Sequence, residues 1–442
     1  MELPDALQWL NARLDHETGS VGLAAGTIEG LSLDAMTQLV AVLGDPQTAM
    51  PVVHITGTNG KGSVAAMVAR LLEAHGLSVG TYTSPHQDRV NERIARNGEP
   101  ISDAELAEVL SGVAAVEHLL DAAPTWFEVV TAAAFRWFAE APVDVAVVEV
   151  GLLGRFDATN VVDAQVAVVT SIGGDHTDFA PGWERAVASE KAGIITPHCT
   201  AVLGEMPDDL AAVFAAEGPA ALWRSGIDFG VRVDATAVGG RLLTIDGYFD
   251  AYDDVLLPLH GAHQAANAAV AVAATEAFFH RGLDADVVRT GLAAVEVPGR
   301  VEVVSHQPLV VLDGAHNPDA LEALATTVTA EFTAAGSRVV VLGMLAGRDP
   351  VAACGAVASM RPDLVVCTSV DGDRGLPAAT LAAAATEAGL PVEVEPDPAR
   401  AVERVLRHAD AEDVVVVTGS FRLLSVARAV ARRLEVGFPS GS

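Results

Sequence analysis

Lysine is almost absent from this chain. It occurs only at Lys61 and Lys191, although the 442 residues include 27 lysines and arginines. Arginine has therefore taken nearly every general-purpose positive charge. A lysine amine is a compact charge that can also lose its proton and react, whereas a guanidinium does neither. The two lysines are thus candidates for roles that arginine cannot fill, the alternative being chance survival on the surface.

Cysteine is also scarce, with no CxxC spacing among the three residues Cys199, Cys354 and Cys367. This pattern argues against a disulfide framework or a structural zinc site and favours a reducing cytoplasm. No apolar run approaches the roughly 18 residues that a membrane-spanning helix needs. The acidic N-terminal stretch lacks the basic-then-apolar pattern of a signal peptide. We therefore expect a cytoplasmic protein without a membrane partner.

Positive charge is in short supply as well, since the formal net charge is −31. A protein that binds along a nucleic acid needs a basic face, so this balance argues against a general nucleic-acid binder. If the ligands are anions, metal ions or a few placed Arg and Lys residues must bring them in.

Apolar runs of strand length alternate with amphipathic helices along most of the chain, a pattern typical of a parallel α/β sheet. Strands are expected at 51–57, 77–84, 143–150, 165–172, 308–313, 339–343, 363–368, 391–395 and 413–418. The Pro-Gly pair within 296–300 breaks both periodicities and indicates a domain boundary. The sequence therefore predicts an α/β fold with a parallel-sheet domain over 1–297 and a smaller Rossmann-like α/β domain over 298–442.

A Gly-rich turn, HITGTNGKGS at 54–63, joins the first of these strands to a helix. Its glycines let backbone N–H groups turn toward an anion, and the helix N-terminus adds partial positive charge. Lys61 can reach the outer phosphates of a nucleotide, and the Ser63 hydroxyl suits Mg²⁺ or a phosphate oxygen. The spacing fits neither the common P-loop nor a dinucleotide fingerprint, and an ordinary Gly-rich turn is the alternative. We expect this loop to bind ATP through Gly57, Thr58, Asn59, Gly60, Lys61, Gly62 and Ser63.

The loop resembles the P-loop variant of the Mur ligase superfamily, and the flanking segments resemble the folylpolyglutamate and dihydrofolate synthases. These segments are LGDPQ (43–47), TSPHQDRVNERIARNG (83–98), TWFEVVT (125–131), EVGLLGRFDATN (149–160), TSIGGDHTDF (170–179), SEKAGI (189–194), HGAHQAANA (260–268), PGR (298–300) and DGAHNP (313–318). The resemblance covers roughly residues 5–430. It implies an ATP-dependent ligase that adds L-glutamate to a folate through an acyl phosphate, and it leaves open whether dihydropteroate is also a substrate.

The chain departs from the family pattern at several positions. Leu153 stands where the family usually has Gly, Phe156 stands where it has Leu, and Gly174 replaces an apolar residue. Near the C-terminus, TGSFRLLSVAR at 418–428 differs from the usual GSLYLVGEVR. These differences bear on loop detail and substrate preference more than on the reaction.

Three polar residues lie at or just beyond the carboxyl ends of expected parallel strands: Ser84, Glu149 and His176. Open α/β sheets place ligands at that edge, and a hydroxyl, a carboxylate and an imidazole make a plausible set for a divalent ion. The alternatives are a strand-end turn for Ser84, a salt-bridged carboxylate for Glu149 and a helix-cap contact for His176. The resemblance implies Mg²⁺ binding at all three positions, and it places His176 with Lys61 and Lys191 at the catalytic centre.

Lys191 lies on an expected helix that begins soon after this edge. An unmodified lysine, with a usual pKa of about 10.4, is cationic. It would oppose another unit positive charge at about 5 Å by roughly 3 kcal/mol at an effective dielectric constant of 20. In the family that the sequence resembles, the matching lysine is carbamylated by CO₂ and its oxygens bind a second Mg²⁺. We therefore expect two Mg²⁺ ions and a CO₂-derived carbamate on Lys191.

The resemblance also implies nucleotide contacts beyond the Gly-rich loop. Asn267 would contact adenine, and Arg300 with Asp313 would contact the nucleotide from the second domain. His316 lies in the same loop as Asp313. The alternatives are a small-residue packing helix around Asn267 and a simple turn at 313–318.

Three further positions match residues that hold the pterin-bearing substrate in the family: Arg89, Phe127 and Asp157. The alternatives are a solvated charge for Arg89 and a core residue for Phe127.

Two other functions remain open at this point. A Mur-type ligase of cell-wall synthesis is disfavoured because the N-terminal 50 residues are too few for the extra domain of those enzymes. A P-loop nucleotide switch would have no use for Lys191 as a metal bridge, and it would hydrolyse ATP without regard to an amino acid. We expect a monomer whose partners are small molecules, namely ATP, L-glutamate and a folate or dihydropteroate.

Overall fold

The computed structural model describes residues 1–14, 32–175, 180–333, 335–370, 372 and 374–434. The chain divides into two compact units. The first unit comprises residues 1–235, 242–257 and 264–295. The second comprises residues 236–241, 258–263 and 296–442. The two units are described separately below.

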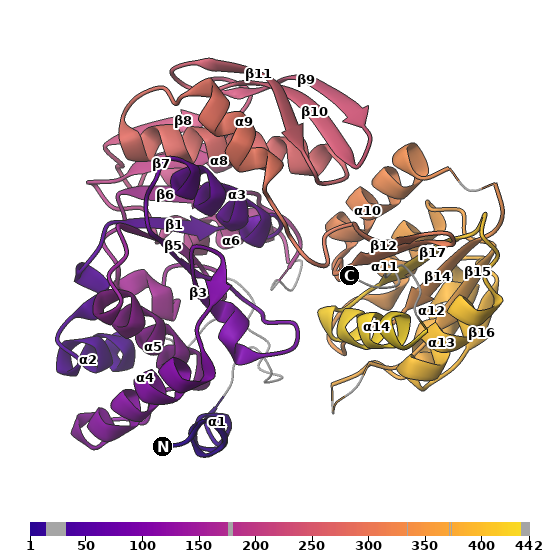
Figure 1. Cartoon of the computed structure of the whole chain (residues 1–442), viewed down its shortest axis with the longest axis horizontal. Helices are drawn as coiled ribbons and strands as arrows, with labels where there is room; N and C mark the ends of the chain where they lie inside the picture. The colour runs from indigo at the N-terminus through magenta and orange to yellow at the C-terminus, as the bar shows by residue number, and fades with distance from the viewer. Residues whose placement is uncertain (15–31, 176–179, 334, 371, 373, 435–442) are drawn as a thin grey trace. The chain divides into compact units, whose positions relative to one another are not determined.

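An eight-stranded sheet forms the centre of the first unit (Figure 1). Its strands, in spatial order, are β4 (Glu99–Pro100), β3 (Ile94–Arg96), β2 (Val79–Tyr82), β5 (Val145–Glu149), β1 (Val52–Thr56), β6 (Val166–Val169), β7 (Thr200–Leu203) and β8 (Ala221–Arg224). The six strands from β2 to β8 run parallel, whereas β3 and β4 pair antiparallel at one edge. Every residue of β1, β5 and β6 is buried, as expected for parallel strands that helices cover on both faces.

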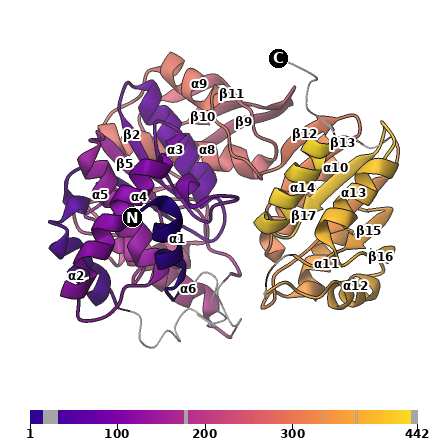
Figure 2. The same ribbon diagram turned by 60° about the horizontal axis from the view of Figure 1, so that its bottom comes forward.

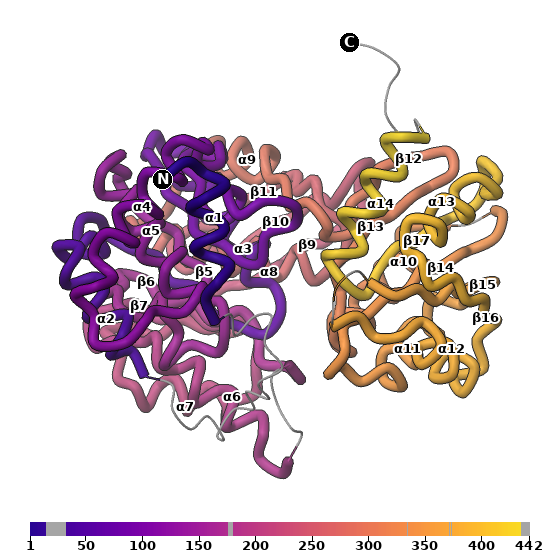
Figure 3. Tube along the Cα trace, turned by 90° about the horizontal axis from the view of Figure 1, so that it is seen from below, coloured from indigo at the N-terminus to yellow at the C-terminus, as the bar shows by residue number. Residues whose placement is uncertain are grey.

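Helices pack on both faces of this sheet. They are α1 (Leu3–Asn11), α2 (Asp34–Val42), α3 (Lys61–Ala74), α4 (Asp103–Val116), α5 (Trp126–Glu140), α6 (Trp183–Ala192), α7 (Asp208–Ala215), α8 (Ala262–Phe279) and α9 (Ala285–Ala293). Helices α4 and α5 share a core with β2 and β5, and α6 and α7 share another with β6 and β7. Helix α6 runs beside α7 (Figure 3), and α3 packs against β1, β2 and β5.

Local signals explain where the helices start. Ser102 accepts a hydrogen bond from the backbone of Glu105, whose side chain returns to Ser102, so α4 begins with a capping box. Thr125 and Glu128 form the same reciprocal pair at the start of α5. Each pair satisfies two backbone donors that a helix start would otherwise leave open.

A three-stranded sheet completes the first part of the chain. Its order is β11 (Ala251–Leu257), β10 (Gly240–Asp246) and β9 (Gly230–Ala237). Helix α9 packs against β11 of this sheet.

The second unit is built on a six-stranded sheet. The spatial order is β12 (Glu302–His306), β13 (Leu309–Asp313), β17 (Val414–Thr418), β14 (Arg338–Leu342), β15 (Leu364–Cys367) and β16 (Val392–Val394). All neighbours are parallel except β12. The helices are α10 (Pro318–Glu331), α11 (Pro350–Ala358), α12 (Ala378–Glu387), α13 (Pro398–His408) and α14 (Phe421–Arg433). The first three build a core on one face and α13 and α14 build one on the other (Figure 2).

The predicted fold class is confirmed, because parallel sheets with helices on both faces form each unit. Within the described residues, no helix combines the length and the apolar character needed to cross a membrane.

Candidate functional site

The Gly-rich loop leaves β1 and enters α3, whose first residue is Lys61. Gly57 and Gly60 have φ angles of 147° and 88°, which side chains rarely adopt. A Cβ atom at Gly57 would lie 1.9 Å from Thr170 Oγ1, and one at Gly60 would lie 2.6 Å from Asn267 Oδ1. The loop therefore requires glycine at both positions, and Asn267 from α8 lies directly beside it.

The segment after β6 holds this loop in place. The Thr58 N–H donates to the Ser171 carbonyl at 2.9 Å, and the Asn59 N–H donates to Ser171 Oγ at 3.0 Å. Thr170 Oγ1 donates to the Asn59 carbonyl at 2.6 Å. Thr170 and Ser171 belong to the TSIG motif, but no role was predicted for either hydroxyl group. Their role is to fix the backbone that presents the loop's N–H groups.

The two lysines of the chain converge on one atom of the loop. Lys61 Nζ donates to the Gly57 carbonyl oxygen at 3.0 Å, and Lys191 Nζ donates to the same oxygen at 2.9 Å. Lys191 is only 4% exposed. Burial, followed by the positive charge of Lys61, lowers the pKa of Lys191 to about 7. An amine with this pKa is partly uncharged near neutral pH.

Glu149 and Ser84 lie together at the same edge of the sheet. Glu149 ends β5 and is buried, and the Ser84 N–H donates to Glu149 Oε2 at 3.0 Å. A Cβ atom at Gly62 would lie 3.6 Å from Glu149 Oε2, so this carboxylate faces the start of α3. His176, the third predicted metal ligand, lies outside the described residues.

The donors at this edge fit a hard divalent cation. A buried carboxylate and a serine sit beside a loop that can bring phosphate oxygens, which matches the oxygen ligands that Mg²⁺ prefers. No cluster of three His, Cys, Asp or Glu side chains capable of holding a metal occurs within the described ranges.

Phe127, from α5, and Asp157 both contact the short loop that follows β5. A Cβ atom at Gly151 would lie 2.4 Å from Phe127 Cζ, and the N–H of Leu152 donates to Asp157 Oδ2 at 2.8 Å. Both predicted substrate residues are buried. Burial raises the pKa of Asp157, and hydrogen bonds from Thr159, Leu152 and Gly151 oppose that rise.

Arg89 lies in a different environment from these two residues. Its side chain is 60% exposed and forms an ion pair with Asp103, which is also exposed. This is the solvated charge named above as the alternative for Arg89, and its role in binding stays a prediction.

Leu153 lies in the loop after β5, at a position where the family usually has glycine. Its φ is 58°, the left-handed region that glycine adopts freely. Its carbonyl accepts a 2.6 Å hydrogen bond from Thr56 Oγ1, and its side chain packs with Val187 of α6. A Cβ atom at Gly154 would lie 3.0 Å from the Lys191 Cα atom. The loop therefore keeps the conformation of a glycine and packs on the helix that carries Lys191.

Polar side chains of α8 continue the site from the loop. Gln264 Nε2 donates to Ser63 Oγ at 3.3 Å, and Asn267 Nδ2 donates to Gln264 Oε1 at 3.0 Å. Ser63, which was predicted to face Mg²⁺ or phosphate, is buried. Gln264 was not singled out from the sequence, although it stands beside the predicted Asn267.

The remaining predicted nucleotide contacts lie in the second unit. The Arg300 guanidinium lies 4.7 Å from the centre of the Phe421 ring. Asp313 ends β13 and accepts hydrogen bonds from the N–H groups of Val301 and Ala315, both at 2.8 Å. Burial raises the pKa of Asp313, and Arg300 opposes that rise. His316 Nδ1 lies 2.7 Å from the Gly314 carbonyl oxygen.

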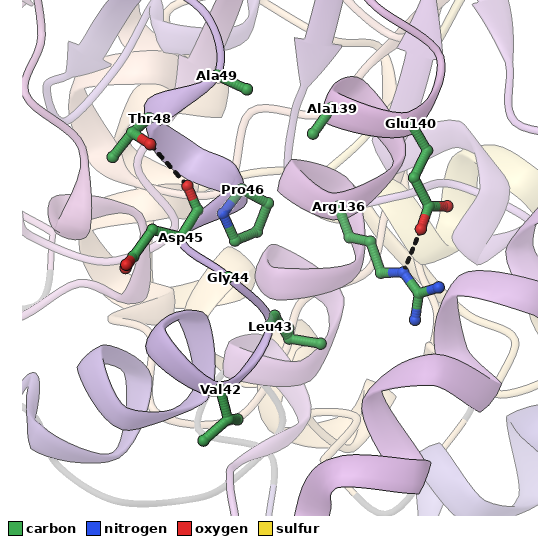
Figure 4. Close-up of a pocket in the computed structure, with 10 residues that line it drawn as sticks. All are labelled: Val42, Leu43, Gly44, Asp45, Pro46, Thr48, Ala49, Arg136, Ala139 and Glu140. Atoms are coloured by element: carbon green, nitrogen blue, oxygen red, sulfur yellow. Dashed lines mark hydrogen bonds and ion pairs between the residues drawn. The ribbon is translucent and has the colours of Figure 1, made fainter.

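A surface pocket of about 420 Å³ lies elsewhere in the first unit (Figure 4). Its walls come from the segment around Asp45 and Pro46 and from the end of α5. Arg136 donates to Glu140 at 2.7 Å on the α5 side. None of the predicted site residues lines this pocket.

Comparison with known proteins decides the family. The model of the Mur ligase middle domain matches residues 55–275, and that of the Mur ligase glutamate ligase domain matches residues 299–421. The chain is 43% identical over 382 residues to the dihydrofolate synthase/folylpolyglutamate synthase of Mycobacterium tuberculosis, which covers 80% of this chain and 78% of that protein. This chain belongs to that family of Mur ligases.

Solved structures agree with this assignment. The folylpolyglutamate synthase of Mycobacterium tuberculosis complexed with ADP superposes with a TM-score of 0.89 at 38% identity, covering 97% of this chain and 98% of that one. A bifunctional folylpolyglutamate synthase/dihydrofolate synthase with Mn, AMPPNP and L-glutamate bound has a TM-score of 0.83 at 31% identity, covering 99% and 98%. The predictions of the family and of an ATP-dependent ligase are therefore confirmed.

Proposed function

We propose that this chain ligates L-glutamate to a folate carboxylate at the expense of ATP, with the reacting centre at the 57–63 loop. One observation carries the proposal. The only two lysines of the chain bind one carbonyl oxygen of this loop, beside the buried carboxylate of Glu149. Cations, N–H donors and a candidate metal ligand thus gather where a triphosphate would lie.

The reaction proceeds in two steps. A carboxylate oxygen of the folate attacks the γ-phosphorus of ATP, the bond to the bridging oxygen breaks, and ADP leaves. The amine of L-glutamate then attacks the acyl phosphate, the amide bond forms, and phosphate and a proton depart. This division replaces a poor leaving group with a good one. Lys61 and the N–H groups of the loop orient the phosphates and balance their charge.

Metal binding falls to the edge where Glu149 and Ser84 lie, with His176 and a carbamylated Lys191 as the further ligands. When bound there, Mg²⁺ balances the charge that develops on the transferred phosphoryl group. Glu149 is buried and faces Gly62 at the start of α3, so its carboxylate would hold the cation beside the loop that binds the phosphates. The Mn found in the related bifunctional enzyme supports a divalent ion.

Lys191 has the properties that carbamylation requires. A neutral amine attacks CO₂, the N–C bond forms and a proton leaves, so a lysine with a pKa of about 7 is a competent reactant near neutral pH. The product carries one negative charge in place of a positive one, which removes the repulsion from Lys61. Its remaining N–H can still donate to the Gly57 carbonyl, the acceptor that the amine uses now.

A single assay tests the proposal. Purified protein is incubated with MgATP and labelled L-glutamate, with tetrahydrofolate and dihydropteroate in separate reactions. We expect ADP release and label transfer that depend on both glutamate and the pterin compound. ADP release that ignores glutamate would contradict a ligase and favour a nucleotide switch. The same preparation, analysed by light scattering, tests the proposed monomer.

A further inference from the structure

A buried histidine connects the strand before the Gly-rich loop with the proposed folate site. His54 lies in β1 with a fully buried side chain, and its Nε2 is 2.8 Å from Thr159 Oγ1. Thr159 Oγ1 is in turn 2.5 Å from Asp157 Oδ1, which also accepts the Thr159 N–H at 3.0 Å. Three side chains thus form a continuous line of hydrogen bonds inside the first unit.

The chemistry of the groups fixes the direction of this line. Both oxygens of Asp157 accept backbone N–H groups, from Leu152 and Thr159, as those of an ionised carboxylate do. An ionised carboxylate only accepts hydrogen bonds, so the Thr159 hydroxyl must give its single proton to Asp157. The hydroxyl then has only lone pairs left for His54, so His54 Nε2 must carry a hydrogen and donate it. A neutral ring with a proton on Nε2 has none on Nδ1. His54 Nδ1 is one of the buried nitrogen atoms without a hydrogen-bond partner in the structure.

Burial keeps the ring in this state. It lowers the pKa of His54 to about 3, so the imidazole is neutral at physiological pH. A neutral ring with one unpaired buried nitrogen costs stability that an apolar side chain would not. A role for the other nitrogen would account for this cost, and within the described residues that nitrogen forms a hydrogen bond with Thr159.

We propose that His54 and Thr159 form a chain of hydrogen-bond donors that fixes the Asp157 carboxylate for an N–H edge of the pterin ring. The inference rests on the proposed function and on the prediction, made from the family resemblance, that Asp157 contacts the pterin-bearing substrate. His54 and Thr159 are positioning residues, because they act through Asp157. The Leu152 N–H on Oδ2 and the Thr159 donors on Oδ1 together hold both carboxylate oxygens in one plane and orientation.

The geometry also couples two parts of the reaction. His54 lies three residues before Gly57, the acceptor of both lysines, and Asp157 lies on the loop that contacts Phe127 and packs on α6. Strand β1 therefore leads into the proposed ATP-binding loop and also carries His54, which supports the Asp157 carboxylate that would orient the folate. Steady-state kinetics can separate this role from a general contribution to folding.

The test compares KM values for the three substrates in Thr159→Val, which keeps the shape and removes the hydroxyl. We expect the KM for the folate to rise about tenfold and the KM values for ATP and glutamate to stay within about twofold. Thr159→Ser, which restores the hydroxyl, should return the folate KM to within about threefold of the parent. The matched control is Thr275→Val, because the Thr275 hydroxyl is equally buried but donates to a carbonyl of its own helix.

Two further measurements keep the proposal testable. In a double-mutant cycle, His54→Leu should add little to the effect of Thr159→Val, because His54 acts only through Thr159. If the effects of the two substitutions on the folate KM were additive, or if all three KM values rose in parallel, the proposed hydrogen-bond chain would be refuted. Nitrogen-15 NMR should show an Nε2–H tautomer for the resonance that disappears in His54→Leu, and an Nδ1–H tautomer would also overturn it.

Asp157→Asn separates this inference from the proposed site. If that variant leaves the folate KM unchanged, the assignment of Asp157 to the substrate is wrong. If it raises the folate KM while Thr159→Val does not, the substrate site stands and the donor chain is refuted.

Discussion

Lys61 and Lys191 share a single acceptor, the carbonyl oxygen of Gly57, at 3.0 and 2.9 Å. Two ammonium groups on one oxygen repel each other, and the more buried one carries the cost. This arrangement explains why the pKa of Lys191 falls to about 7, since burial and the charge of Lys61 both disfavour its proton. A chain that uses arginine almost everywhere has thus kept its two lysines at one point.

Replacing Lys61 by alanine should reduce turnover by at least about a hundredfold, because a charge that orients transferring phosphate is lost. Glutamate-dependent ADP release measures turnover, and circular dichroism checks that the fold persists. The control is Arg70→Ala on the same helix, where the guanidinium pairs with Glu73. Turnover close to that of the parent protein in Lys61→Ala would contradict the proposal that the 57–63 loop binds the phosphates of ATP.

Lys191→Arg should be nearly inactive although it preserves positive charge, because a guanidinium stays protonated and cannot take up CO₂. Lys191→Ala should be inactive as well, and acetate should restore part of its activity by filling the vacated space. Lys191→Glu should keep residual activity, since its carboxylate is a shortened substitute for the carbamate. Arg185→Ala, an exposed change on the same helix, serves as the control. Full activity of Lys191→Arg would refute the carbamate.

Glu149→Gln should shift the Mg²⁺ titration of activity to higher concentration by about tenfold or more, because an ionised oxygen ligand is lost from a small hard-cation site. The backbone contact from Ser84 can persist, since an amide oxygen also accepts a hydrogen bond. His176→Ala should act in the same direction. Unchanged titrations in both variants would mean that the metal is held elsewhere.

Stability should fall as the solution is acidified below about pH 6.5. The pKa of His54 is lowered to about 3 and that of His263 to about 4, so the unfolded chain binds these protons before the folded one does. The contribution of each histidine to the free energy of unfolding is complete above about pH 6.5, the pKa of histidine in the unfolded chain. It is lost as the pH falls toward the pKa of that histidine in the folded protein. His54→Gln should reduce the slope of the free energy of unfolding against pH by up to about 1.4 kcal/mol per pH unit, as measured by urea unfolding at several pH values. An unchanged slope would contradict a neutral buried ring.

Leu153→Gly should destabilise the protein in spite of relieving the left-handed backbone. The relief is roughly 1–2 kcal/mol, whereas removing a buried leucine side chain costs about 2–5 kcal/mol, so a net loss of up to about 4 kcal/mol is expected. Because the side chain packs on α6, activity should fall as well. A more stable variant would show that backbone strain outweighs the packing of Leu153 on Val187.

The fold followed from periodicity because buried parallel strands such as β1, β5 and β6 read as continuous apolar runs. The Gly-rich loop at 57–63 could also be predicted, because the spacing of its glycines indicates where the backbone must turn. The structure adds contacts between residues distant in sequence. Periodicity marks Thr159 as one polar residue among several, and only the fold brings it to His54, 105 positions away.

Two further features were beyond the reach of sequence patterns. Burial raises the pKa of Asp157, and the burial of this side chain depends on how the loop packs in the folded protein. The amino-acid sequence of the loop does not reveal it. The convergence of Lys61 and Lys191 on Gly57 could be suspected from their rarity, but the shared acceptor depends on how α6 packs in the folded first unit, against the loop at Gly154 and in a core with β6 and β7.

The scarcity of lysine turns the shared Gly57 carbonyl into a chemical reporter. Apart from the terminal amine, the 442 residues carry two primary amines, on the partly exposed Lys61 and on the buried Lys191, and both lie at the proposed ATP site. Labelling stoichiometry would then count occupancy directly: nucleotide shields Lys61, and CO₂ consumes the nucleophile of Lys191. Fluorescent or isotopic tags introduced this way would sit in the reacting centre itself, with no lysine elsewhere on the surface to dilute the signal.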